Sequence, residues 1–204
     1  MEDILDLYAE AHDPLYPVVC FDERPYQLVS QIVEPIPAEP GRRQRYDYHD
    51  KREGTCNLFI IFCPSQAWRH ITVTRQRTKT DFAHQMRALV DVYFPKALQI
   101  RLVLDNLNIH VASALYETFQ AAEARRILRR LAFHYTPIHA SWLNMVELEL
   151  AVVSRQCLDR RLGSLTQLRR EIWMWEAERN DQQATVDWRF TCEKARLNTR
   201  LYPA

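Results

Sequence analysis

The sequence predicts an α/β fold in which a mixed β-sheet is flanked by helices. Short apolar segments of strand length alternate along the chain with longer segments whose apolar residues recur at helical spacing. Hydrophobic residues make up 47% and charged residues 26% of the 204 residues, which is the composition of an ordinary globular protein. A chain of this length can form one sizeable α/β domain with its own core.

Five apolar segments are predicted to be strands because each is short and bounded by turn or charged residues. The third would run antiparallel to the second across a turn at Pro64 and Ser65. Residues 24–56 contain four prolines and the charged run RRQRYDYHDKREG, so we expect an exposed loop or hairpin there. The predicted strands cover residues 17–23, 57–63, 67–74, 98–104 and 131–136.

Four segments have the spacing of helices. The first follows Thr80, which is a suitable cap for a helix over residues 81–93. The others are predicted over residues 110–128, from Asn144 onward, and over residues 165–180. This order of strands and helices gives a mixed sheet with helices on its faces, which is the plan of ribonuclease-H-like domains.

The chain is predicted to have three parts. Residues 1–16 form a lead or linker, residues 17–162 form the core, and residues 163–204 form a C-terminal helix and tail packed on that core. The tail is expected to pack back through Trp188, Phe190 and Tyr202.

Charge and cysteine usage exclude several classes of protein. The formal net charge is only +1, although 23 of the 27 basic residues are arginines. Five cysteines without CxxC spacing argue against a disulfide framework or a zinc site. The N-terminus has no leader pattern, and no apolar stretch approaches the roughly 20 residues of a membrane helix. We therefore expect a soluble, cytoplasmic protein.

Three carboxylates are the candidate catalytic and metal-binding residues. Asp22 is among the last residues of the first predicted strand and Asp105 directly follows the fourth, and ligand sites of open α/β sheets lie at the carboxyl ends of strands. Glu147 lies early in a predicted helix, so the three can converge if the first and fourth strands are neighbours. Oxygen ligands of this kind suit two Mg²⁺ ions, with Mn²⁺ as a substitute.

Each candidate has a structural alternative. Asp22 and Asp105 could be ordinary turn residues at strand ends. Asn144 and Glu147 match a capping box, in which Glu147 would only stabilise the helix start. The sequence also leaves open Glu23 and Glu149 as ligands and His110 and His139 as structural histidines.

Five segments resemble insertion-sequence transposases of the mariner-like DDE class: VVCFDE, GTCNLFIIFCP, LVLDNLNIH, HYTPIHASWLNMVELELAVVSRQCLDRR and DWRFT. The resemblance implies a ribonuclease-H-like fold, cleavage at transposon ends and strand transfer. It also implies that Asp22, Asp105 and Glu147 bind the metal ions. In the mechanism that we expect from this set, Asn106, His110 and Asn144 would be positioning groups. Ile138 stands where many relatives carry a basic residue.

The expected function is that of a metal-dependent DNA transposase acting as a homo-oligomer on DNA. Such transposases usually carry helix-turn-helix modules before the core, whereas this sequence begins almost at the core, so we expect a fragment, a split-frame product or a decayed copy that is inactive alone. The alternatives are an idle remnant or regulator that associates with full-length transposase, and a nuclease of the same fold.

DNA binding is expected to be weak and unspecific, through three arginine clusters: Arg42, Arg43 and Arg45; Arg125, Arg126, Arg129 and Arg130; Arg155, Arg160 and Arg161.

Overall fold

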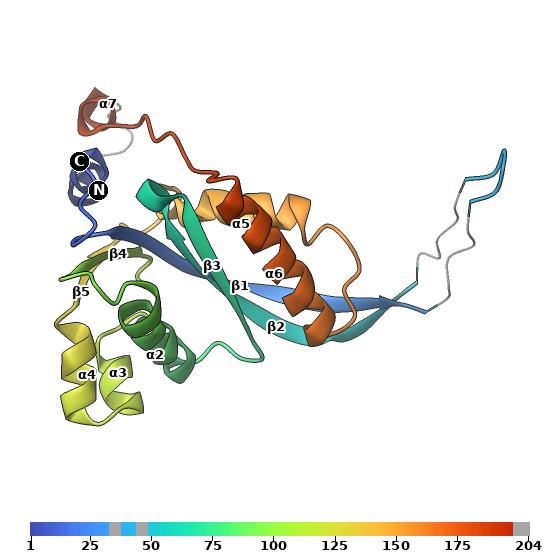
Figure 1. Ribbon diagram of the computed structural model, residues 1–204, viewed down its shortest axis with the longest axis horizontal. Coiled ribbons are helices and arrows are strands. Elements are labelled where there is room, and N and C mark those ends of the chain that lie inside the picture. Colours follow the sequence, from blue (N-terminus) through green and yellow to red (C-terminus); the bar gives the residue numbers. More distant parts are fainter. Residues whose placement is uncertain (33–37, 44–48, 198–204) are drawn as a thin grey trace.

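A five-stranded mixed sheet forms the centre of the computed structural model, which describes residues 1–32, 38–43 and 49–197 (Figure 1). The strand order is β3-β2-β1-β4-β5. The first three strands are antiparallel neighbours, whereas β4 runs parallel to β1 and β5 parallel to β4. The predicted mixed sheet is therefore confirmed. The strands are β1 (Val18–Gln31), β2 (Asp50–Cys63), β3 (Trp68–Thr74), β4 (Ile100–Leu104) and β5 (Leu131–Tyr135).

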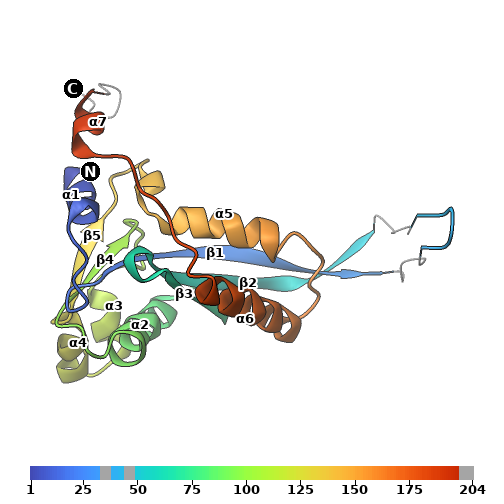
Figure 2. The same cartoon turned by 45° about the horizontal axis from the view of Figure 1, so that its top comes forward.

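The hairpin formed by β1 and β2 is much longer than the sequence predicted. Its strands pair from Cys20 opposite Phe62 to Gln31 opposite Asp50, and they project beyond the helices (Figures 1 and 2). Of the loop or hairpin expected over residues 24–56, the structure shows a paired hairpin through residues 24–31 and 50–56, and Pro25 is compatible with this strand. β4 pairs with β1 only as far as Cys20, so Pro25 lies where β1 has an open edge. Residues 33–37 and 44–48, including Arg45, lie outside the described residues.

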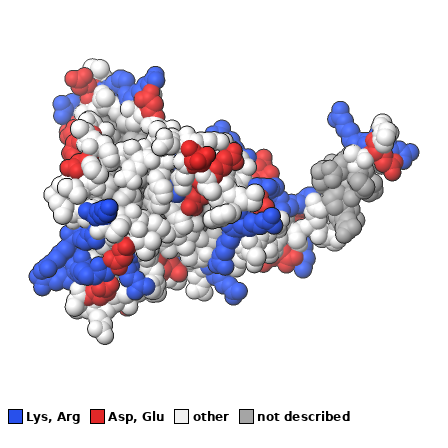
Figure 3. All heavy atoms as spheres, viewed as in Figure 1, with Lys and Arg blue, Asp and Glu red and all other residues white. Residues whose placement is uncertain are grey.

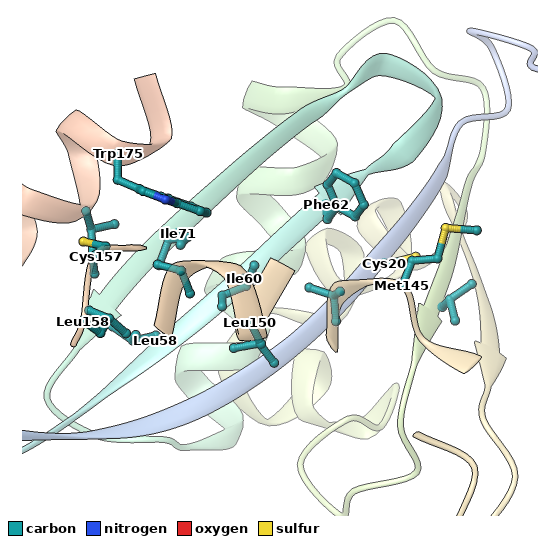
Figure 4. Packing of buried hydrophobic residues seen from close by; sticks show 14 of the residues in the cluster. Cys20, Leu58, Ile60, Phe62, Ile71, Met145, Leu150, Cys157, Leu158 and Trp175 are labelled. Atoms are coloured by element: carbon teal, nitrogen blue, oxygen red, sulfur yellow. The ribbon is translucent and has the colours of Figure 1, made fainter. Parts of the chain in front are cut away.

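Two hydrophobic cores lie on the two faces of the sheet. In β2, Leu58 and Ile60 belong to one core, whereas Phe59 and Ile61 belong to the other, because successive strand residues point to opposite faces. Helices α5 (Val146–Gln156) and α6 (Leu165–Asp181) cover the first face, and α5 and α6 residues pack onto it in Figure 4. The second face is covered by α2 (Lys79–Ala88), α3 (Ser113–Thr118) and α4 (Ala121–Leu128).

Two helix predictions need correction. Helix α2 is capped by Thr78 rather than Thr80, because Asp81 lies three residues after Thr78 and completes a capping box with it. The helix continues as a π-helical turn over Leu89–Tyr93. The single helix predicted over residues 110–128 is two helices, since the backbone becomes extended at Phe119 and Gln120.

The two ends of the described chain pack side by side. Helix α1 (Glu2–Ala9) contributes to the first core through three buried residues, so the predicted lead is an integral helix. Trp188 and Phe190 of the tail pack against the same core and lead into α7 (Cys192–Leu197), whereas Tyr202 lies outside the described residues. The boundaries between the three parts stay a prediction. No helix in the described ranges is long and apolar enough to cross a membrane.

Candidate active site

Asp22 and Asp105 approach the same edge of the sheet because β1 and β4 are parallel neighbours. The last pair in their register joins Cys20 to Val103, and both residues belong to the core beneath α5. Asp22 and Asp105 each lie two positions further along, so the alternation of strand side chains directs them toward that same face. Convergence of the three acids required the first and fourth strands to be neighbours, and in the structure β1 and β4 are neighbours.

Glu147 is brought to this face by the start of α5. The helix begins at Val146, and Asn144 anchors it by donating from its amide nitrogen to the carbonyl of Phe21 at 2.9 Å. Phe21 directly precedes Asp22, so this bond ties the helix start to the strand that carries the first acid. The alternative capping box is not formed, because the N-cap is Met145 and has no side-chain cap.

The three predicted acids line one open pocket of about 570 Å³. Within the described ranges, no three His, Cys, Asp or Glu side chains are gathered tightly enough to hold a metal ion as they stand. The carboxylates therefore share a pocket and must move closer together to share an ion. The remaining lining residues are Glu23, Arg24, Arg77, Leu107, Ser141, Leu150 and Ala151.

Asp22 has the most perturbed carboxylate of the pocket. Burial is the largest cause that raises its pKa to about 7; the negative charges of Asp105, Glu23 and Glu147 act in the same direction, and the backbone N–H of Glu23 acts against them. An ionised Asp22 is thus costly unless a cation compensates it. An all-oxygen set of ligands around such a group has the chemistry that Mg²⁺ or Mn²⁺ requires.

Asp105 and Glu23 are joined by a buried histidine. The ring of His110 donates from Nδ1 to Asp105 Oδ1 at 2.5 Å and from Nε2 to Glu23 Oε2 at 2.7 Å. Burial alone would lower the pKa of His110, but the two carboxylates outweigh it and raise the pKa to about 9. With a carboxylate oxygen facing each ring nitrogen, the charged imidazolium, in which both nitrogens donate, is the favoured form. Glu23 also pairs with Arg77 at 3.1 Å.

A match to a protein-family model identifies the family of this chain. Residues 17–169 match the model described as DDE superfamily endonuclease. The chain belongs to this family. The matched range contains all three predicted acids, and the resemblance to a mariner-like DDE core is confirmed. No curated protein sequence matches the chain.

Solved structures similar to this DDE endonuclease come from the Mos1 mariner transposase. The Mos1 paired end complex with Mn has a TM-score of 0.61 and 17% sequence identity, over 89% of this chain and 54% of that one. The Mos1 strand transfer complex has a TM-score of 0.59 and 15% identity, over the same shares of 89% and 54%. The chain thus spans about half the length of these proteins. Similarity at this identity shows the fold, and it confirms the predicted ribonuclease-H-like architecture.

The two alternative acids of the DDE endonuclease, Glu23 and Glu149, are already paired with basic side chains. The side chain of Glu23 is fully buried between His110 and Arg77. Glu149 is buried away from the pocket, where it pairs with Arg69 at 3.2 Å and Arg179 at 2.9 Å. These contacts leave Asp22 and Glu147 as the better candidates for the first and third acids.

Other residues singled out in the sequence take different places. His110 is buried beside Asp105, whereas His139 is exposed and adopts a positive φ of 63°. Asn106 is exposed, and Ile138 is 79% exposed. Sequence reasoning missed Arg77 as a pocket residue, because nothing in the segment after β3 indicates that it folds back toward β1.

Proposed function

We propose that this DDE endonuclease chain is the catalytic domain of a transposase, in which Asp22, Asp105 and Glu147 bind two Mg²⁺ ions. The observation that carries the proposal is the shared pocket, which collects three carboxylates from β1, the end of β4 and α5. The burial that raises the pKa of Asp22 supports it, because the ionised form of Asp22 needs a compensating cation.

The chain's own residues supply ligands and positioning. Asp22, Asp105 and Glu147 would hold the ions through carboxylate oxygens, and Asn144 keeps the helix of Glu147 against β1. When bound, two Mg²⁺ ions in such a site supply activation of an attacking oxygen and stabilisation of a leaving one. The attacking groups are water in hydrolysis and a DNA 3′-hydroxyl in joining.

Positive side chains border the pocket on the side open to solvent. Arg24 is exposed, and the side chain of Arg77 is 44% exposed although it pairs with Glu23. Both can meet phosphates of a DNA strand that enters the pocket. Further Lys and Arg side chains gather at the end of the molecule that carries α4 (Figure 3). We propose DNA as the substrate and a homo-oligomer on DNA as the active form.

The proposal is tested by nicking of DNA that carries a transposon end, measured with Mg²⁺, Mn²⁺ or EDTA on the chain fused to an end-binding module, because the chain alone is expected to be inactive. Asp105→Asn provides the matched variant, because it keeps the size of the side chain and removes its charge. We expect metal-dependent nicking by the wild type and none by the variant. Equal nicking by both would contradict the proposed site. A wild-type chain that never nicks DNA but inhibits an active full-length transposase would instead support the regulator.

A further inference from the structure

The buried histidine His110 has no place in the proposed chemistry itself, because it does not line the pocket. Its side chain is fully buried, and both ring nitrogens are used. One contacts Asp105, a proposed ligand, and the other contacts Glu23, which lies on the neighbouring strand. The ring therefore connects the end of β4 to β1.

The orientation of this ring is fixed from several directions. Phe21 packs edge-on against it with ring centroids 5.4 Å apart, and Phe82 lies at 5.1 Å. The backbone carbonyl of His110 accepts from the hydroxyl of Tyr135 at 2.8 Å, and its N–H donates to the carbonyl of Leu107 at 2.9 Å. The turn after β4 is thereby folded back so that the ring meets Asp105.

The charge on the far side of the ring is also balanced. Glu23 accepts from His110 through Oε2 and from Arg77 through Oε1, so both of its oxygens are engaged. Glu23 thus cannot turn away from the ring without leaving a buried charge unpaired, which is costly. Arg77, Glu23 and His110 form a continuous series that ends on one oxygen of Asp105.

We propose that His110, braced by Glu23, is a positioning residue that fixes the carboxylate of Asp105 for metal binding. Nδ1 holds Oδ1 of Asp105, which leaves the second oxygen for an ion in the pocket. Hydrogen-bond partners of ligating carboxylates set their direction, and their loss typically lowers metal affinity about 10- to 100-fold. This inference rests on the proposed metal-binding role of Asp105.

Two substitutions of the histidine separate positioning from packing. In His110→Asn the amide nitrogen lies near the place of Nδ1 and can still contact Asp105. In His110→Gln it lies near the place of Nε2 and can contact only Glu23. Both variants lose ring packing against Phe21 and Phe82, so their unfolding midpoints in EDTA should fall together.

The readout is Mn²⁺ affinity of the full chain, measured by calorimetry without DNA, beside the unfolding midpoint in EDTA. We expect about a 10- to 100-fold loss of affinity in His110→Gln and a smaller loss in His110→Asn. Asp105→Asn should lose this binding altogether, and His110→Gln in that background should change it no further. His84→Gln is the control, since His84 is exposed.

Every other result would overturn the inference, and each would point to a different explanation. Wild-type affinity in a folded His110→Gln variant would show that the histidine is only structural. Equal losses in both histidine variants would attribute the effect to lost packing. Mn²⁺ binding that does not depend on Asp105 would remove the proposed site along with the inference. If neither histidine variant folds, Glu23→Met decides, because it keeps the approximate size of Glu23 and removes the oxygen that accepts from Nε2: unchanged affinity there rejects the positioning role.

Discussion

Glu147 and Glu149 lie two residues apart on α5, yet their surroundings are opposite. Glu149 is 2% exposed and is held by two arginines, Arg69 from β3 and Arg179 from α6. Glu147 opens into a pocket where Asp22 and Asp105 add further negative charge. The charge of Glu149 is balanced within the protein and stabilises the packing of α5, β3 and α6. The negative charge gathered around Glu147 is what the proposed cations would balance. On the same helix, a structural acid thus lies two residues from the proposed metal ligand.

The largest effect should come from Glu147→Gln, which we expect nearly to abolish metal-dependent cleavage. Gln cannot supply the negative charge that holds a hard divalent ion. The helix start should lose ~1 kcal/mol or less, because no side-chain cap depends on Glu147. Nicking rates and thermal unfolding in EDTA measure the two effects. Wild-type rates beside an inactive Asp105→Asn control would show that the third ligand is another residue.

Glu149→Gln should have the opposite effect: it should lower the stability of the fold and leave cleavage by the folded protein intact. It leaves Arg69 and Arg179 without their buried counter-charge, a change that typically costs about 3–5 kcal/mol. Urea unfolding without metal measures the loss. The protein that remains folded should still nick DNA. Full stability together with lost cleavage would assign Glu149, and not Glu147, to the site.

Asp22→Asn should raise stability in the absence of metal at pH 8. The pKa of Asp22 rises from 3.8 to about 7 on folding, so the folded chain keeps a proton that the unfolded chain loses between these values. Wild-type stability therefore falls as pH rises through this window, and Asn avoids the cost, which is at most ~4 kcal/mol. Urea unfolding in EDTA at pH 5 and pH 8 measures it.

Two controls sharpen the test of Asp22. Asp159→Asn, at an exposed carboxyl, should not reproduce the gain. Added Mg²⁺ should stabilise the wild type more than Asp22→Asn, because only the wild type offers the charged ligand. A gain that is independent of pH would attribute the effect to something other than the charge of Asp22.

The smallest effect concerns the arginines of α4. Arg126 pairs with Asp91 and Glu123, whereas Arg125 and Arg129 are exposed. Replacing Arg125 and Arg129 with Gln should weaken DNA binding and reduce the slope of log affinity against log salt by about 2. Arg126→Gln should leave that slope nearly unchanged. Fluorescence anisotropy over a salt series measures both, and equal slopes in all three proteins would exclude α4 from the DNA contact.

The parts of the fold that sequence could predict are those carried by local pattern. All five strands were expected because apolar runs such as NLFIIFC are bounded by turn or charged residues. The length of the hairpin was not, since its outer half is exposed and its pairing depends on partners about 20 to 30 residues away. Arg69 illustrates the same limit. The alternation of residues along β3 could be predicted, but the complete burial of an arginine there could not, because it depends on α6 closing over it.

Part of the candidate site could likewise be predicted from local sequence, and part could not. Two acids expected at strand ends and one on a helix could be proposed from their positions, although Asp22 in fact lies within β1, which continues to Gln31. The link between Glu23 and His110 could not, because it joins residues 87 positions apart and depends on which strands are neighbours. The bond by which Asn144 anchors α5 to Phe21 could not be foreseen either, since the spacing of Asn144 from Glu147 equally matched a cap.

The outer edge of β3 is occupied by side chains of α6. Asn180 accepts from the N–H of Arg69 and donates to its carbonyl, Glu176 accepts from the N–H of Ile71, and Arg169 donates to the carbonyl of Val73. Backbone groups at a sheet border otherwise form a template for strands of other molecules. With these groups already bonded, β3 resists both strand addition and edge-to-edge aggregation. Copies of this chain that associate must therefore meet through surfaces other than a sheet continued across β3.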